Sequence, residues 1–345
     1  MLHFALIRID KCDIIDHHQQ LCEEKHMEKQ NKMIFTRDEQ FPVSEEFPDG
    51  VIPVQWMAPL YEEALIDYRF DVVYDERDGQ KSTLQILTPM LPGLPGVPFE
   101  APEPPEKFPL IIYIPGSAWL KQMLLMKMAR TIKVCQRGFA VAIVEYRPST
   151  TAPFPAQIED AKTAVRFMRK HAEEYNIDPN RIAIWGDSSG GHTAVMAGIT
   201  DDGVLDNRQF GEFSASVKCI VDWFGPTDIA AMGDYPSMME HSHPDTPEGL
   251  LIGHLDVLEN PELAQKTMPV NYLSKEKDIP PILIMHGDVD DVVHFNQSCR
   301  LYNKLKELDK DVTMYKLEGS GHGTGGFEAI ESIDTVCSFV RKHLG

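Results

Sequence analysis

The stretch Arg181-Ile-Ala-Ile-Trp-Gly-Asp-Ser-Ser-Gly-Gly-His192 is the part of the chain around which the rest is organised. Its residues 182–185 form an apolar run of strand length, and residues 189–200 suit a helix. Between the two, Gly186-Asp-Ser-Ser-Gly190 matches G-x-S-x-G, a pattern that places its serine on a sharp turn between strand and helix. The pattern predicts an exposed nucleophile at Ser188, although a capped helix after a glycine turn fits the same letters.

The composition is that of a globular protein. The 345 residues are 43% hydrophobic and 25% charged, which is enough for one large α/β domain or two smaller ones. The formal net charge of −20 disfavours nucleic acid and anionic membranes as partners. No apolar run has the length of a membrane span, and the six cysteines lack metal-ligand spacing. We therefore expect a cytoplasmic protein without a metal site.

The first third of the chain is the least regular. Residues 1–33 are rich in charged and amide side chains without periodicity, which predicts a disordered extension or an over-long translation start. Runs at 66–74 and 82–88 suit a β-hairpin. Residues 89–109 hold eight of the 25 prolines, so they form either a domain linker or, as we prefer, a long surface loop. We expect one domain over residues 34–345.

Strand-length apolar runs alternate with helical patterns from residue 110 onward. This alternation predicts a mostly parallel, doubly wound sheet flanked by helices. Residues 225–279 interrupt it after the sixth strand, and an insertion of that length is expected to form a cap over the substrate pocket. The expected strands are 110–114, 140–144, 182–185, 217–223, 282–285 and 312–317, and the expected helices are 118–136, 155–174, 189–200, 297–308 and 327–343.

A serine hydroxyl becomes a nucleophile only with a base in hydrogen-bond reach, and the base needs an acid to orient it. The candidates for the acid follow the strand at 282–285, where Asp288, Asp290 and Asp291 compete. Loops after strand ends carry such groups, and at least one of the three is also expected to cap the helix that follows.

His322 is the expected base, because it follows the serine and the candidate acids along the chain. It lies in the glycine-rich loop 318–323, after the strand at 312–317, where a flexible backbone lets an imidazole reach the serine. His286 and His294 are rivals, although His286 ends a buried strand and suits a structural role. A catalytic serine also needs N–H donors for the developing oxyanion, and we expect one from Ser189 and a second from the loop 115–119.

Several motifs together resemble one family. The chain is similar to the α/β-hydrolase esterases related to hormone-sensitive lipase, especially the bacterial feruloyl-esterase-like carboxylesterases, from about residue 66 to the C-terminus. The resemblance implies the α/β-hydrolase fold and a triad of Ser188, Asp290 and His322. It rests on Tyr146-Arg-Pro-Ser149, Ala152-Pro-Phe-Pro-Ala156, Gly186-Asp-Ser-Ser-Gly-Gly-His192, Asp222-Trp-Phe-Gly-Pro-Thr-Asp228, His286-Gly-x-x-Asp290 and Gly321-His322.

One loop departs from the family pattern. The family usually has His-Gly-Gly-x-Trp where this chain has Pro115-Gly-Ser-Ala-Trp119. The first histidine is missing, and the second glycine is Ser117. Because these changes leave the backbone N–H groups in place, the resemblance still implies Ser117 and Ala118 as oxyanion donors alongside Ser189.

The resemblance implies a serine carboxylesterase that forms an acyl-enzyme on short acyl or aryl esters, such as acetyl or hydroxycinnamoyl esters. It needs no cofactor, and its expected partner is a small-molecule ester, with homo-oligomerisation left open. A serine amidase, arylformamidase or peptidase is the alternative enzyme. A non-catalytic binding scaffold is disfavoured because such proteins usually lose a triad member.

Overall fold

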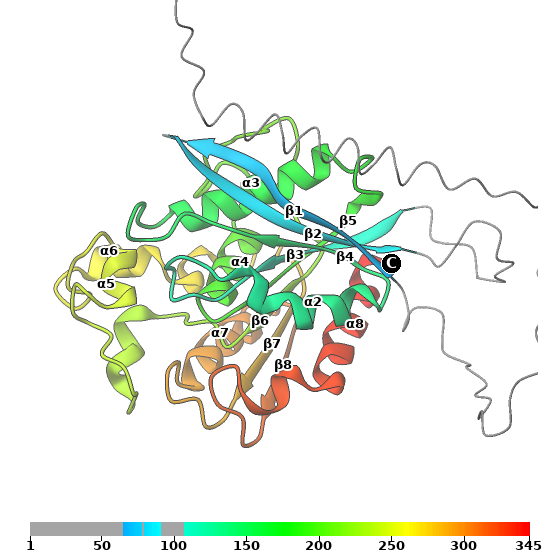
Figure 1. The fold of residues 1–345 in the computed structure, drawn as a ribbon. Helices are drawn as coiled ribbons and strands as arrows, with labels where there is room; N and C mark the ends of the chain where they lie inside the picture. Colours follow the sequence, from blue (N-terminus) through cyan, green and yellow to red (C-terminus); the bar gives the residue numbers. More distant parts are fainter. Residues whose placement is uncertain (1–64, 78, 91–106) are drawn as a thin grey trace, which may run out of the picture. The chain divides into compact units, whose positions relative to one another are not determined.

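An eight-stranded sheet runs through the residues that the computed structural model describes, namely 65–77, 79–90 and 107–345 (Figure 1). The strand order is β1-β2-β4-β3-β5-β6-β7-β8, with β1 and β2 antiparallel to each other, β2 antiparallel to β4, and the remaining neighbours parallel. The mostly parallel sheet predicted from the sequence is confirmed. The strands are β1 Leu65–Arg77, β2 Gln80–Met90, β3 Phe108–Ile114, β4 Ala140–Val144, β5 Ile177–Asp187, β6 Ile220–Trp223, β7 Ile282–Gly287 and β8 Val312–Leu317.

Two predictions concern residues outside this range. The extension at residues 1–33 and the boundary at residue 34 lie outside the described residues, as do residues 91–106 of the proline-rich stretch. Within the described part of the chain, no helix is long and apolar enough to cross a membrane. The same part contains no cluster of three His, Cys, Asp or Glu side chains that could hold a metal ion.

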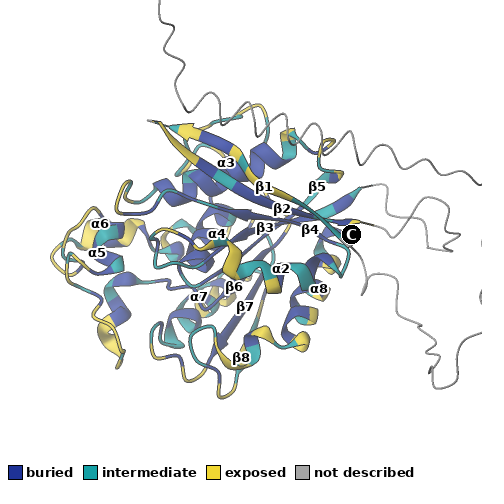
Figure 2. Ribbon diagram, in the orientation of Figure 1, coloured by how far each residue is buried: buried dark blue, intermediate teal, exposed yellow. Residues whose placement is uncertain are grey.

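The central strands are apolar without alternation because helices cover both faces of the sheet. Every residue of β4 is buried, and Figure 2 shows the middle of the sheet coloured as buried. On one face, Ile112 and Ile184 pack with Val165 of α3. On the other face, Ile111 packs with Val336 of α8. Helices α3 Ala156–Lys170, α4 Ser189–Ile199 and α7 Asn296–Glu307 contribute to the first face, and α2 Met128–Cys135 and α8 Ile330–Leu344 to the second.

The first predicted helix is wrong over its first half. Instead of a helix from residue 118, the chain forms a loop, then the 3-10 helix η1 Leu124–Lys127, and only then α2. Ala118 and Trp119 have φ values of 57° and 54°, in the left-handed region that cannot continue a right-handed helix. An apolar pattern does not reveal this, because the Trp119 ring is buried all the same. A similar break places η4 Gly325–Glu328 before α8.

Strand β5 begins earlier than predicted. Residues 178–180, which lie before the predicted start at residue 182, belong to the strand, where the pairing with β3 shifts register between Phe108 and Leu110. The Asn180 N–H donates to the Asp178 carboxylate at 2.8 Å, so the local turn exists as an irregularity inside the strand. The hairpin turn of β1 and β2 is likewise shorter than predicted, because pairing continues to the last residues of β1.

The segment 224–281, which we call the insertion, connects β6 to β7. Its helices are short, and a small apolar cluster of its own holds them together. The buried Trp119 from the loop after β3 belongs to this cluster, so the insertion packs against that loop. The helices are η2 Ile229–Asp234, α5 Pro247–Leu251, α6 Pro261–Lys266 and η3 Pro269–Tyr272, and the cluster is Trp119, Ile229, Leu251, Ile252, Val257 and Ala264.

Candidate active site

Ser188 occupies the sharp turn between β5 and α4. Its φ of 55° and ψ of −129° are unusual for a residue with a side chain, and such strain is typical of a nucleophile elbow. Two neighbouring glycines make the turn possible. A Cβ at Gly186 would lie 2.0 Å from the Gly190 carbonyl oxygen, and one at Gly190 would lie 2.0 Å from the Ile114 carbonyl oxygen. The local sequence therefore folds this way because only glycine fits on both sides of the serine.

A chain of hydrogen bonds joins three loops at the carboxyl edge of the sheet. His322 Nε2 lies 2.9 Å from Ser188 Oγ, and His322 Nδ1 lies 2.8 Å from Asp290 Oδ2. Asp290 follows β7 and His322 follows β8, and parallel neighbouring strands bring the loops after them to one edge. The geometry suits His322 as a base toward the serine and Asp290 as the group that orients the ring.

Asp290 is held as an ionised acceptor. Its Oδ1 accepts the N–H groups of Val292 and Val293 at 2.9 and 2.8 Å, and its Oδ2 lies 3.3 Å from His286 Nε2. Burial by itself raises the pKa of Asp290. The hydrogen bonds from His286 and His322 outweigh that effect and hold the pKa well below its usual range.

The competing aspartates lie elsewhere. Asp288 accepts the Gly319 N–H at 2.7 Å and faces Lys316, while Asp291 is exposed to solvent. The expectation that one of the three aspartates caps the following helix is wrong. Helix α7 begins after Phe295 and has no side-chain cap, because Asp290 closes its own tight turn instead.

The competing histidines also have other partners. His286 is fully buried, with Nδ1 2.7 Å from Ser298 Oγ and Nε2 2.8 Å from the Val293 carbonyl oxygen. It supports Asp290 from behind and does not reach the serine. The ring of His294 stacks on Tyr235 with the planes 2° apart. Of the predicted bases, the structure therefore brings only His322 to Ser188.

The three predicted oxyanion donors differ in their partners. The Ser117 N–H donates to Ser189 Oγ at 2.9 Å, and the Ser117 hydroxyl donates to the Leu120 carbonyl at 2.6 Å. The N–H groups of Ala118 and Ser189 have no hydrogen-bond partner among the described residues. Ser117 thus shapes the loop, and of the three predicted donors only the Ala118 and Ser189 N–H groups are without a partner among the described residues.

Sequence reasoning missed the role of Asp187, the residue before the nucleophile. Its Oδ1 accepts the Tyr113 hydroxyl at 2.6 Å and the Gly116 N–H at 3.0 Å, and its Oδ2 accepts Lys127 Nζ at 2.6 Å. Burial raises the pKa of Asp187, but the charges of Lys127 and Arg130 outweigh burial and lower it. This carboxylate therefore ties the turn at Ser188 to the loop 115–119, which we call the oxyanion loop after its predicted donors. Only its acidic character inside G-x-S-x-G could have drawn attention to it.

Comparison with known proteins assigns the family. The model of the BD-FAE family matches residues 99–305, which is more than half of the chain. The chain belongs to the BD-FAE family. The resemblance stated from the motifs is thereby confirmed, and the protein is an α/β-hydrolase of the carboxylesterase group.

Relatives of this BD-FAE family member are named as esterases. Esterase LipC of Mycobacterium tuberculosis (strain ATCC 25618 / H37Rv) is 26% identical over 223 residues, or 64% of this chain and 54% of LipC. The probable isoprenylcysteine alpha-carbonyl methylesterase ICME of Oryza sativa subsp. japonica is 24% identical over 64% of this chain and 53% of that protein. The chain thus spans about half the length of the curated relatives it matches.

Solved structures share the same fold. A truncated form of a carbohydrate esterase from gut microbiota is 31% identical, with a TM-score of 0.69 over 81% of this chain and 96% of that one. The propionate-bound esterase Est2 of Thermogutta terrifontis is 19% identical, with a TM-score of 0.60 over 82% of this chain and 96% of that one. At that identity, the second likeness concerns the fold alone.

Two cavities of different size meet at Ser188 in this BD-FAE family member. The larger, of about 510 Å³, contains His322 in its wall and is partly charged. The smaller, of about 30 Å³, lies beside Ala118 and Ser189 and is mainly apolar, and His322 is not among its lining residues. The charged residues of the larger cavity are Lys127, Arg130, Asp187 and Glu328, and the apolar walls of the smaller include Trp119, Pro226, Met232, Val292 and Val293.

Proposed function

We propose that the protein is a serine carboxylesterase in which Ser188 is the nucleophile. The observation that carries the proposal is the hydrogen-bonded chain from Ser188 Oγ through His322 to Asp290, opening onto a cavity of about 510 Å³. A serine hydrogen-bonded to a histidine, which is hydrogen-bonded in turn to a buried carboxylate, performs acyl transfer on unrelated folds. The esterase names of the relatives support the same reaction.

The reaction follows from the positions of five groups. His322 Nε2 takes the Ser188 proton while Asp290 holds the Nδ1–H of the ring, and Ser188 Oγ bonds to the ester carbonyl carbon. The N–H groups of Ala118 and Ser189 stabilise the negative oxygen of the tetrahedral intermediate. The intermediate collapses as the C–O bond to the alcohol breaks and the alcohol takes the proton from His322. Water then repeats these steps on the acyl-enzyme and releases the acid.

The position of the base orients the substrate. Because His322 returns its proton to the leaving alcohol, the alcohol lies in the larger cavity that His322 lines. The acyl group then enters the smaller cavity. Because this cavity is much smaller than the first, it suits a short acyl group such as acetyl better than a hydroxycinnamoyl group. We therefore favour short acyl esters, and the charged groups around Lys127 suit an alcohol that carries further hydroxyl groups.

Two measurements on the purified protein test this proposal. A fluorophosphonate probe is expected to label the wild type and not Ser188→Ala, with both proteins folded by circular dichroism. The value of kcat/KM for p-nitrophenyl acetate is expected to exceed that for methyl ferulate and for a p-nitrophenyl ester of a long acid by at least about tenfold.

The outcomes separate the parts of the proposal. An unlabelled wild type without activity on any ester would rule out the serine esterase. Strong labelling with hydrolysis of an anilide but not of the acetate would replace it with an amidase. A preference for methyl ferulate would show that the acyl group does not enter the smaller cavity.

A further inference from the structure

His192, on the first turn of α4, is a buried histidine with two defined partners. Its Nε2 lies 2.8 Å from the Thr267 carbonyl oxygen, and its Nδ1 lies 3.2 Å from Trp119 Nε1. A carbonyl oxygen only accepts, so Nε2 carries the proton. An indole N–H only donates, so Nδ1 is the unprotonated acceptor. The two contacts together select one neutral tautomer of the ring.

The surroundings keep the ring neutral. Burial lowers the pKa of His192 to about 4, although the hydrogen bond to Thr267 opposes that shift. A protonated ring would direct a second N–H at the indole N–H of Trp119, and that contact would be repulsive. Near neutral pH the arrangement therefore persists as described.

The histidine joins three parts of the molecule that the proposed mechanism uses. Its backbone N–H donates to the carbonyl of Ser188 at 3.1 Å, which places it beside the nucleophile. Trp119 belongs to the oxyanion loop and follows Ala118 directly. Thr267 is the residue at which α6 of the insertion ends. The rings of Trp119 and His192 also meet edge to face, with centroids 5.3 Å apart.

The oxyanion loop needs such an anchor. Ala118 and Trp119 both adopt φ values above 50°, and each non-glycine residue held in that region costs on the order of 1 kcal/mol or more. The conformation persists only where surrounding contacts hold it. Hydrogen bonds of Gly116 and Ser117 hold the start of the loop, and the Trp119 side chain adds contacts through His192 and through the apolar cluster of the insertion.

We propose that His192 is a positioning residue for the oxyanion hole. Through Trp119 it holds the Ala118 N–H at the position where it can donate to the same oxygen as the Ser189 N–H. Through Thr267 it couples this position to the insertion. The proposal rests on the proposed function, because the hole matters only if Ser188 forms an oxyanion. A donor displaced by about 1 Å lowers the rate of the chemical step roughly 10²-fold. Binding of the ester in the ground state depends much less on that donor.

Three substitutions test the proposal by steady-state kinetics on p-nitrophenyl acetate. His192→Phe keeps the ring but loses both hydrogen bonds, and its kcat is expected to fall roughly 10²-fold with KM within about threefold. Trp119→Phe removes the indole donor together with part of the ring that packs in the insertion cluster, and it is expected to lower kcat in the same direction. His192→Gln offers both a donor and an acceptor and is expected to restore kcat to within about tenfold of the wild type.

A spectroscopic signal and a matched control accompany the kinetics. The indole ¹⁵N–H resonance that disappears in Trp119→Phe belongs to Trp119, and it is expected to shift in His192→Phe. Thr200→Val removes a buried hydrogen bond at the other end of α4, where Thr200 Oγ1 donates to the Met196 carbonyl, and should leave kcat within about twofold.

The failures are distinguishable. An inactive wild type overturns the proposed function and this inference with it. An active wild type together with a folded His192→Phe whose kcat stays within about twofold overturns the positioning role alone. If His192→Phe does not fold, a Trp119→Phe protein with unchanged kcat overturns the role instead. A His192→Gln protein as impaired in kcat as His192→Phe also counts against it.

Discussion

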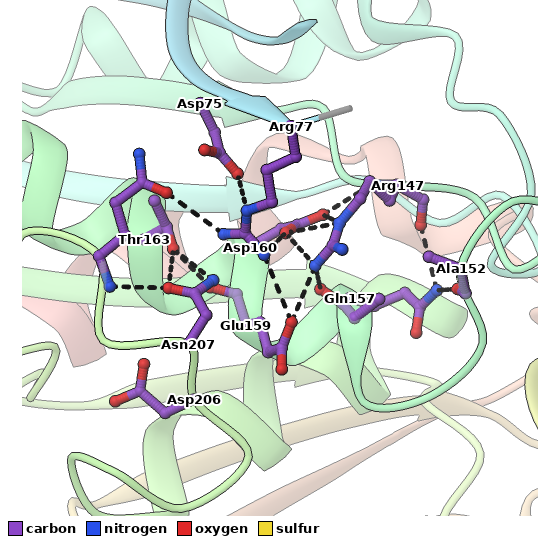
Figure 3. Close-up of polar contacts among 12 residues, drawn as sticks. Asp75, Arg77, Arg147, Ala152, Gln157, Glu159, Asp160, Thr163, Asp206 and Asn207 are labelled. Atoms are coloured by element: carbon purple, nitrogen blue, oxygen red, sulfur yellow. Dashed lines mark hydrogen bonds and ion pairs between the residues drawn. The ribbon is translucent and has the colours of Figure 1, made fainter. Parts of the chain in front are cut away.

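Two carboxylates, Asp290 in the candidate active site and Asp160 in α3, are equally removed from solvent but differ in what binds them. Asp290 faces the ring of His322, whose second nitrogen reaches Ser188. Asp160 accepts four hydrogen bonds from the guanidinium and backbone N–H of Arg147 at 2.8 to 3.1 Å (Figure 3). A guanidinium stays protonated in proteins and passes no proton on. Burial alone therefore does not mark the site; the chemistry of the partner does.

The Asp160 cluster holds the hairpin of β1 and β2 to α3, the helix that connects β4 to β5. Arg77 of β1 bonds to Asp75 at 2.8 Å and approaches Asp160, and Arg147 also bonds to Glu159 at 2.9 Å (Figure 3). Burial raises the pKa of Asp160, and the hydrogen bonds and charge of Arg147 only partly offset the rise. None of these residues lines the cavities beside Ser188. We therefore expect the cluster to serve stability, whereas the proposed triad would position reacting atoms.

The largest expected effect is the loss of kcat when Asp290, the carboxylate of the candidate active site, is replaced. Asp290→Asn is expected to lower kcat for p-nitrophenyl acetate by about 10⁴-fold, because an amide no longer selects the histidine tautomer that accepts the serine proton. Asp288→Asn serves as the matched control, since Asp288 bonds only outside the triad, and its kcat should stay within about twofold. A larger loss in Asp288→Asn than in Asp290→Asn would reverse the assignment.

Replacing Asp160, the carboxylate of the Arg147 cluster, is expected to lower stability and to leave activity unchanged. Asp160→Asn replaces one of the two acceptor oxygens that face Arg147 with an NH2 donor, so the free energy of unfolding should fall by about 2 kcal/mol in urea denaturation. The value of kcat/KM per folded molecule should stay within about twofold. Glu159→Gln, at the partly exposed edge of the cluster, should cost less than about 1 kcal/mol. A tenfold loss of kcat/KM in folded Asp160→Asn would contradict the division between the two regions.

Asp222 is a third buried carboxylate, and its effect on stability is expected to depend on pH. Asp222 accepts the Gly225 N–H at 2.9 Å, and its Oδ2 has no hydrogen-bond partner among the described residues. Burial raises the pKa of Asp222 to about 6, although the Gly225 N–H and His286 act in the opposite direction. Because the pKa is higher in the folded protein, protonated Asp222 contributes to the free energy of unfolding. This contribution is present in full below about pH 4, the ordinary pKa of the carboxyl group, and is lost as the pH rises through about 6.

Urea denaturation across pH measures this contribution. Between about pH 4 and about pH 8, the stability of the wild type relative to Asp222→Asn is expected to fall by about 2 kcal/mol. Asp290 has the opposite sign, because its pKa is lowered: its contribution is present above about pH 4 and lost as pH falls below that. A stability difference for Asp222→Asn that does not change with pH would show that Asp222 is not the group that titrates.

The sequence predicted the sheet and the positions of its loops well because these depend on local patterns. Buried parallel strands are continuous apolar runs, and G-x-S-x-G needs its glycines at fixed spacing, so both are visible in the letters. The prediction of a helix from residue 118 was wrong because Ala118 and Trp119 adopt positive φ angles, which end a helix and are not visible in the sequence. Nothing in an apolar pattern distinguishes a buried tryptophan in a helix from one in a strained loop.

The sequence by itself determined the fold class, the elbow at Ser188 and the short set of residues from which a base and an acid could come. The motif resemblance had already singled out Asp290, and the tertiary structure shows its contact with His322. Only the tertiary structure decided which N–H groups are without a partner beside Ser188 and that His192 connects Trp119 to the insertion. The physical reason is that these contacts join loops that follow different strands. Their distances are set by strand order and packing, and neither is contained in the spacing of residues along the chain.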